Sequence, residues 1–199
     1  MRKTIAKKGT SRYPFLIINE RETKRKIMTN HPRESLRKLM NRSNHNCFGC
    51  SPGNDKGLRM EFYTDEKAVF SWVTIPPHLC GWETLAHGGV ISTVMDEVMS
   101  WTTIYLLKTF ILTKSITVDF LKPVFVETEV RAEGRVVEKI SDREALIEGS
   151  LYNAENVLCA RSRGTFALIS LDFMKRMGRF QEEEIEEFRQ MLEVRTAPG

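Results

Sequence analysis

Alternating apolar and polar residues recur along the middle of this 199-residue chain. A period of two residues predicts β-strands with one buried face, and each alternating run has the length of a single strand. Pro76-Pro77 ends the second run, and the segment 153–156 (NAEN) predicts a hairpin turn between the last two. The predicted strands are residues 58–63, 68–75, 114–120, 128–140, 144–153 and 157–169.

Residues 89–107 follow a different pattern, with apolar side chains every three or four positions. At about 100° per residue, these side chains form one broad apolar side of a helix, which predicts burial against a sheet. The predicted order is two strands, this helix and four further strands with short links. That order indicates an antiparallel sheet packed on one helix, an α+β fold. The apolar side consists of Val90, Ile91, Val94, Met95, Val98, Trp101 and Tyr105.

The opposite side of the same helix lacks the Lys, Arg and Glu residues of an ordinary solvated face. Its small residues predict close packing by a second copy of the chain, by a ligand, or by both. Asp96 is the single carboxylate there, and we favour it as the functional acid. Glu97 lies about 100° further round the helix, and we interpret it as a surface acid. The residues on this side are Gly89, Ser92, Thr93, Asp96, Ser100 and Thr103.

The helix opens with His87-Gly88-Gly89. Glycine allows a substrate to approach the backbone, and the first N–H groups of a helix have no internal partner, so they can stabilise an oxyanion. The alternative is a tight strand-to-helix turn without chemistry. Gly88 and Asp96 are eight residues apart, about 12 Å along one helix, so a single helix cannot bring both to one substrate. If both act together, the site lies between two antiparallel copies in a homodimer.

We divide the chain into a basic N-terminal extension (1–43), a central domain (44–170) and a C-terminal amphipathic helical segment (171–199). The extension holds 13 Lys/Arg and 3 Asp/Glu. It is interpreted as a solvated arm, and contacts with anionic membranes or ligand phosphates stay open. Nucleic acid is not expected as a partner, because no nucleic-acid-binding motif follows. Residues 35–42 predict a short helix, and so do residues 181–195, with Ile185, Phe188 and Leu192 on one face.

No apolar run reaches the ~20 residues of a membrane-spanning helix. The first residues are basic without the apolar core of a secretory signal, so we expect a cytoplasmic protein with free thiols. Their lack of acids leaves a mitochondrial presequence open. The motif Cys47-Phe48-Gly49-Cys50 has three interpretations: a redox pair, a zinc site completed by His45 and Cys80, or a structured loop. We favour the loop and predict no metal, because no second close pair of ligands follows.

Three separated motifs resemble the hotdog-fold acyl-CoA thioesterases of the PaaI-like group. They are HGGVISTVMD at 87–96, TKSITVDFLKP at 113–123, and the spacing C-F-x-C…N…G-L between Cys47 and Leu58. The resemblance covers roughly residues 44–170. It implies a hotdog fold, in which an antiparallel sheet wraps one long helix, and hydrolysis of a CoA thioester by a homodimer or a dimer of dimers. It implies no cofactor beyond the coenzyme A of the substrate.

The resemblance also assigns roles to residues. Asp96 matches the catalytic carboxylate, acting as nucleophile or on water, and the Gly88 N–H matches the oxyanion donor. His87 shapes the turn, and Thr113 matches a hydroxyl near the catalytic acid of the other subunit. Where some relatives carry Asn or Gln, this chain has Gly81. Expected substrate-binding residues are Gly89, Gly81 and Trp82, with Lys122, Arg143, Arg161 and Arg163 for the phosphates of coenzyme A.

Trp82, Trp101 and Phe110 are the expected walls for the acyl group. Acyl dehydratases, which share the fold, are excluded because no His follows Asp96 in the helix. The alternative function is a non-catalytic protein that binds acyl-CoA or responds to lipid. A zinc-stabilised regulatory protein comes third.

Overall fold

A computed structural model describes residues 33–42 and 44–193 of the chain. The chain divides into two compact units, residues 1–35 and 36–199. Of the first unit, the structure describes a 3₁₀ turn, η1, at Arg33–Ser35. The predicted role of the basic arm therefore falls largely outside the described residues.

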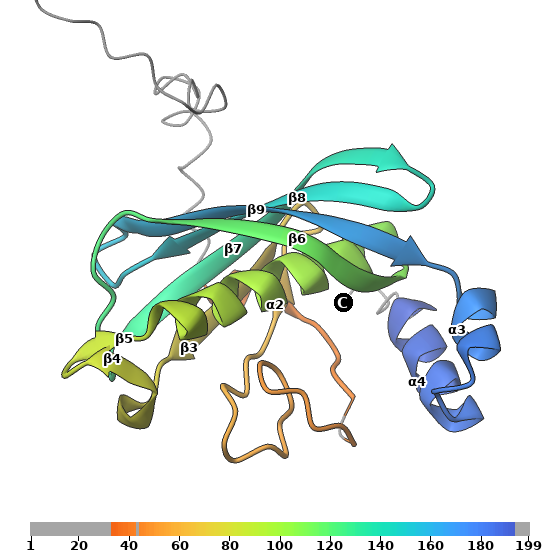
Figure 1. Cartoon of the computed structure of the whole chain (residues 1–199), viewed down its shortest axis with the longest axis horizontal. Coiled ribbons are helices and arrows are strands. Elements are labelled where there is room, and N and C mark those ends of the chain that lie inside the picture. Colours follow the sequence, from red (N-terminus) through yellow and green to blue (C-terminus); the bar gives the residue numbers. More distant parts are fainter. Residues whose placement is uncertain (1–32, 43, 194–199) are drawn as a thin grey trace, which may run out of the picture. The chain divides into compact units, whose positions relative to one another are not determined.

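The second unit is built on a seven-stranded sheet in which all neighbouring strands are antiparallel. One long helix, α2 (Gly88–Leu107), packs along one face of this sheet (Figure 1). A separate hairpin, β4 (Cys80–Trp82) and β5 (Leu85–Ala86), leads directly into α2. The order across the sheet is β1 (Arg37–Lys38), β2 (Tyr63–Thr64), β3 (Val69–Thr74), β7 (Glu129–Ser141), β8 (Glu144–Tyr152), β9 (Leu158–Ile169) and β6 (Phe110–Phe120).

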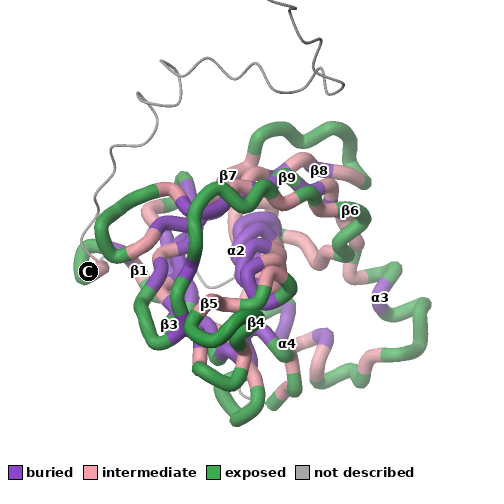
Figure 2. The backbone as a smooth tube through the Cα atoms, turned by 60° about the vertical axis from the view of Figure 1, so that its left-hand side comes forward, coloured by how far each residue is buried: buried purple, intermediate pink, exposed green. Residues whose placement is uncertain are grey.

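The apolar side of α2 forms the centre of the core, as its pattern predicts. Figure 2 shows the helix as a largely buried rod within the curve of the sheet. Gly134 in β7 permits this close packing: a Cβ there would lie 2.8 Å from the carbonyl oxygen of Val98. The sheet wrapped around one helix is the predicted α+β hotdog arrangement. The α2 residues with no exposed surface are Val94, Met95, Val98, Met99, Thr102 and Thr103.

Two predicted elements near the start of the unit are wrong. Residues 35–42 do not form a helix, because Leu36 and Leu39 are buried through the pairing of β1 with β2 and the bond from Leu39 N–H to Phe62 O. Residues 58–62 alternate between buried and exposed as predicted, but they pair with a loop rather than a strand. Met60 N–H, for example, donates to Gly49 O. In both segments, pairing with residues distant in the sequence determines the backbone conformation and overrides the local pattern.

The C-terminal part contains two helices, α3 (Leu171–Met177) and α4 (Glu182–Glu193), of which the sequence predicted the second. Gly178, with φ of 61°, ends α3 in the left-handed conformation that favours glycine. Ile185 and Phe188 of α4 are buried, together with Met174 of α3. None of the helices in the described part combines the length and apolar character needed to cross a bilayer.

Candidate functional site

The start of α2 presents an unused backbone donor. His87 is the N-cap residue, and its Nδ1 accepts a hydrogen bond from Gly89 N–H at 2.9 Å. The N–H groups of Val90 and Ile91 both donate to His87 O. Gly88 N–H has no hydrogen-bond partner among the described residues, and it lies where the helix dipole is positive. Among the first four amides of α2, the Gly88 N–H is therefore the one without a partner in the described part of the chain.

The surface around Gly88 is open and apolar. The β4–β5 hairpin brings Gly81 against His87, since a Cβ at position 81 would lie 3.2 Å from His87 Cα. A larger side chain at position 81 would therefore press on the residue that caps the helix. The Phe120 ring borders Gly88, and Trp82 is 81% exposed. An acyl or pantetheine chain would find apolar contacts here without displacing any core residue.

Asp96 lies on the half-buried side of α2 and is held by Thr113. Thr113 Oγ1 donates to Asp96 Oδ1 at 2.9 Å within the same chain, whereas the sequence analysis expected it beside the acid of another subunit. The β6–β9 register shifts between Thr113 and Ser115, and such a bulge redirects side chains toward the helix. Burial raises the pKa of Asp96, the Thr113 hydrogen bond lowers it, and the charge of Cys47 raises it further.

The sequence predicted an uncovered face of small residues on this side of α2, and all but one of the remaining residues fit that prediction. Ser92 and Thr93 are half-buried, and each hydroxyl donates back to a helix carbonyl, that of Gly88 or Gly89, at 3.0 Å. Because neither hydroxyl extends outward, these side chains do not protrude from the helix surface. Thr103 is the exception, because it has no exposed surface and donates to Met99 O. The uncovered strip of α2 therefore runs from its start to Ser100.

Glu97 is not the surface acid that its flank position suggested. The loop of residues 44–57, orange in Figure 1, covers it, and Cys47 Sγ and Glu97 Oε1 are hydrogen-bonded at 3.1 Å. Gly49 makes this possible, since a Cβ there would lie 2.2 Å from Glu97 Cγ. The possible ligand atoms of Cys47, Cys50 and Glu97 all lie within 4.8 Å of one another.

The three groups shift one another's pKa values. Burial, followed by the charge of Cys47, raises the pKa of Glu97 to about 8. The hydrogen bond from Cys50 lowers the pKa of Cys47 to about 4, and amides of Cys50 and Gly49 add to that effect. The same hydrogen bond to Cys47, together with burial, raises the pKa of the Cys50 thiol. The lowered pKa of Cys47 and the raised pKa of Glu97 place the negative charge of this cluster mainly on the Cys47 sulfur.

The ligand set of the alternative zinc interpretation, His45, Cys47, Cys50 and Cys80, is only partly assembled. Cys80 is exposed on β4, outside this cluster. His45 Nδ1 accepts from Cys47 N–H at 3.3 Å, which places the ring beside the loop rather than among the three ligand atoms. The free thiols expected from the sequence are present at all four positions, Cys47, Cys50, Cys80 and Cys159.

The basic residues expected to bind phosphates do not form one group. Arg161 pairs across the sheet with Asp119 and makes an ion pair with it at 3.0 Å, next to Phe120 and hence to Gly88. Lys122 follows on the same side, where its N–H bonds to Cys159 O. Arg163 lies two residues further along β9 and 3.9 Å from Glu148.

Arg143 lies elsewhere. It forms the turn between β7 and β8, and its carbonyl accepts from Leu168 N–H. Leu168 is seven residues along β9 from Arg161, roughly 20 Å or more away at the rise of a strand. Within one chain, Arg143 therefore lies apart from Gly88, Arg161 and Lys122.

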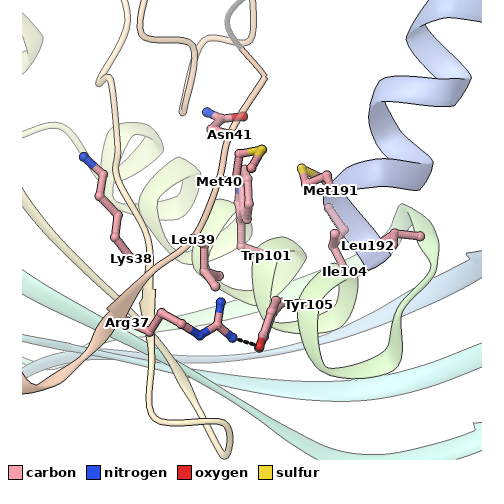
Figure 3. A pocket seen from close by; sticks show the side chains of 10 residues that line it. All are labelled: Arg37, Lys38, Leu39, Met40, Asn41, Trp101, Ile104, Tyr105, Met191 and Leu192. Carbon is pink, nitrogen blue, oxygen red and sulfur yellow. Dashed lines mark hydrogen bonds between the residues drawn. The ribbon is translucent and has the colours of Figure 1, made fainter. Parts of the chain in front are cut away.

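A separate cavity of about 360 Å³ lies at the other end of α2 (Figure 3). Trp101, Tyr105 and Arg37 line it, and Met191 of α4 closes one side. Trp101 also stacks on Phe62, with ring centroids 4.7 Å apart. Of the expected acyl walls, Trp101 therefore lines a cavity.

Phe110 does not line that cavity. Its ring contacts those of Phe180 and Phe188, with centroids 5.6 and 5.3 Å away, and it belongs to a cluster with α3 and α4. The C-terminal helices cover it, so we withdraw it as a wall of the acyl site. Trp82, as noted, is on the open surface beside the start of α2.

Residues 84–160 match the thioesterase superfamily. This segment includes the start of α2, Asp96, Thr113 and Lys122. It leaves out Gly81 and the loop that carries Cys47 and Cys50. The match thus covers the proposed reaction centre, and the Cys47–Cys50–Glu97 cluster joins a matched helix to an unmatched loop.

Solved structures share the hotdog fold with this chain. AziG of S. sahachiroi is 18% identical, with a TM-score of 0.52 over 56% of this chain and 91% of that one. The smu.793 protein of Streptococcus mutans UA159, solved bound to acetyl CoA, has 18% identity and a TM-score of 0.52 over 56% and 89%. Zebra fish thioesterase superfamily member 2 has 17% identity and a TM-score of 0.52 over 60% and 88%. No curated protein matches the chain.

The matched segment also contains Glu97, whose burial against the Cys47–Cys50 loop the sequence did not predict. A signal for its burial is present in the sequence. Glu97 and Trp101 are four residues apart and therefore share a face of the helix, and Trp101 was already assigned to the buried side. The Cys47–Cys50 loop could not be assigned to that face, because no local pattern links it to α2.

Proposed function

We propose that this protein is an acyl-CoA thioesterase that acts as a homodimer, with each reaction centre shared between two subunits. The observation that carries the proposal is the pairing of an unused Gly88 amide with a Thr113-supported Asp96 on the same uncovered side of α2. The match of residues 84–160 to the thioesterase superfamily supports the reaction class. Two similar structures were solved with acetyl CoA or coenzyme A, which supports the substrate class.

The proposed mechanism uses one group from each subunit. The thioester carbonyl oxygen accepts a hydrogen bond from Gly88 N–H, which stabilises the oxyanion of the tetrahedral intermediate. Asp96 of the partner subunit either takes a proton from the attacking water or attacks the carbonyl carbon itself. The carbon–sulfur bond then breaks, and coenzyme A leaves as a thiolate. In the water route this thiolate takes up the proton held by Asp96; in the direct route the acyl–Asp96 anhydride is then hydrolysed by water, which returns the carboxylate and supplies the proton for the thiolate. These groups are sufficient for hydrolysis, so we propose no cofactor beyond the substrate's coenzyme A.

The strip from Gly88 to Ser100 is the proposed contact between two copies of α2. Antiparallel helices would bring Gly88 of one copy to Asp96 of the other, which one helix cannot do over about 12 Å. β6 contacts α2 and, among the described strands, pairs only with β9, so its free edge is proposed to extend this contact. Lys122 and Arg161 lie beside Phe120 and are proposed to bind the phosphates of coenzyme A.

The test is a complementation experiment between two inactive variants. Asp96→Asn removes the carboxylate function, and Gly88→Pro removes the amide donor while proline suits the first position of a helix. The extended His87 backbone, with φ of −64° and ψ of 136°, tolerates a following proline. We expect each homodimer to lose hydrolysis of a panel of short, long and aromatic acyl-CoAs.

Unfolding and refolding the two variants together should restore about a quarter of wild-type activity, because half of the dimers are mixed and each has one intact centre. Each variant refolded alone is the control. No recovery on mixing would contradict the shared centre. Binding of acyl-CoA by the wild type without turnover would support the non-catalytic alternative instead.

A further inference from the structure

The cluster of Cys47, Cys50 and Glu97 has a second chemistry that thioester hydrolysis does not use. From its geometry we infer that Cys47 Sγ, Cys50 Sγ and a Glu97 carboxylate oxygen bind a thiophilic divalent cation of the zinc class. The site joins the loop of residues 44–57 to α2. It is independent of the reaction proposed above.

The ligand spacing fits such an ion. Zinc–sulfur bonds of about 2.3 Å and zinc–oxygen bonds of about 2.0–2.2 Å in a tetrahedral site place ligand atoms roughly 3.5 Å apart. The three ligand atoms here lie within 4.8 Å of one another, and Cys47 Sγ is already 3.1 Å from Glu97 Oε1. The two cysteines also have the C-x₂-C spacing common in zinc sites.

The backbone holds the two thiols in place. Ser51 N–H donates to Cys47 O at 3.2 Å, and Asn41 Nδ2 donates to Cys50 O at 2.7 Å. Amides of Gly49 and Cys50 are directed at the Cys47 sulfur. Amide donors of this kind orient and stabilise a metal-bound thiolate, as second-shell partners do at other sites. The loop is therefore already folded around the ligand positions.

Asp96, a further acid outside the cluster, adds a small contribution to the raised pKa of Glu97, so a divalent cation would offset acidic groups on this part of α2. A buried polar atom also lies beside the loop. His45 Nε2 has no hydrogen-bond partner among the described residues, while its Nδ1 accepts from Cys47 N–H. Water or a reoriented His45 would provide the fourth ligand.

Binding forms two metal–sulfur bonds and one metal–oxygen bond. Any protons on the ligand groups pass to solvent as the metal binds, and no electrons are transferred. The bound ion would fix the loop to α2 one residue away from Asp96. A disulfide between Cys47 and Cys50 is the competing chemistry, and it would remove both sulfur ligands.

Cobalt(II) is the probe. The full-length protein, reduced and treated with chelator, should bind one equivalent with intense tetrahedral ligand-field bands and a thiolate charge-transfer band. Zinc(II) should displace it and raise the thermal unfolding temperature. Cys47→Ser, Cys50→Ser and Glu97→Gln should each weaken binding by more than about 100-fold, since outer-shell partners alone account for 10–100-fold. Cys80→Ser is the matched control, because Cys80 is a cysteine outside the cluster.

Alkylation of the wild type gives a readout that does not depend on whether the variants fold. Zinc should protect Cys47 and Cys50 from iodoacetamide, while Cys80 reacts as before. Reduced wild-type protein that gives no cobalt bands would overturn the site, and so would bands that persist in Cys47→Ser. Because hydrolysis is not measured, failure of this proposal and failure of the thioesterase proposal are distinguishable.

Discussion

Asp96 and Glu97 are neighbours on one helix, yet the fold gives them opposite surroundings. Asp96 points to the uncovered strip of α2 and is supported by the neutral hydroxyl of Thr113. Glu97 points about 100° away and is enclosed by a loop that supplies two thiols. Similar acids thus have different chemistry, and the difference comes from what packs against each flank of the helix.

Both carboxyl groups have raised pKa values, but the causes lead to different roles. Burial raises the pKa of Asp96, and Thr113 opposes that shift by donating to the carboxylate. Burial and the charge of Cys47 raise the pKa of Glu97 to about 8. The groups that shift this pKa include no hydroxyl donor comparable to Thr113. A carboxylate supported by a donor suits attack on a carbonyl. A carboxyl group between thiols suits a soft cation.

The largest expected effect is the loss of activity on substitution of Asp96, which tests whether Asp96 and Glu97 have different roles. Asp96→Asn should lower kcat for acyl-CoA hydrolysis by about 10²–10⁴-fold, because the amide can neither accept a proton nor attack the carbonyl. Glu97→Gln should cost less than about tenfold, since that side chain faces the loop. Initial rates with saturating acyl-CoA measure both. Asp142→Asn is the control, because that carboxyl side chain is 97% exposed at the end of β7. A larger loss from Glu97→Gln than from Asp96→Asn would reverse the assignment.

A second change acts on the Glu97 side alone. Gly49→Ala would place a Cβ 2.2 Å from Glu97 Cγ, so the loop or the carboxylate must move. We expect a loss of about 1–3 kcal/mol in the free energy of unfolding, which is typical of overpacking. Urea denaturation of the metal-free protein measures it. Gly53→Ala in the same loop should change little, because its Cβ would meet nothing closer than Ser51 Oγ at 3.9 Å. Equal stability of the two variants would mean that Gly49 is not needed to enclose Glu97.

The sequence predicted the Asp96 side well because the relevant signals are local. The 3.6-residue pattern places Asp96 opposite the buried stripe, and the glycines that open α2 mark its unused amide. The strands around Gly134 and near the last hairpin also follow a local two-residue period. Each of these features depends only on residues that lie close together in the sequence.

The Glu97 side was missed because its cause is not local. Cys47 and Glu97 are fifty residues apart, and their contact depends on the path of an irregular loop. The same reason explains the error at residues 35–42, where pairing with β2 overrides a weak helical pattern. The sequence did not show that Arg143 lies apart from Arg161 and Lys122 within one chain, because strand register, rather than sequence order, decides which basic side chains share an end of the sheet.

The smallest expected effect is a shift in the pH dependence of activity, which tests the contrast between the surroundings of Asp96 and Glu97. Thr113→Val removes the hydroxyl that lowers the pKa of Asp96, so that pKa should rise further and more of the carboxyl group should be protonated at a given acidic pH. The acid limb of the kcat/KM profile should therefore move to higher pH. At pH values on the acid limb, the rate should fall by about 2- to 13-fold, which corresponds to a hydrogen bond worth roughly 0.5–1.5 kcal/mol. Thr113→Ser keeps the hydroxyl and should retain the wild-type profile. A Thr113→Val limb that moves to lower pH would mean that Thr113 does not support the Asp96 carboxylate, and the contrast with Glu97 would then rest on burial alone.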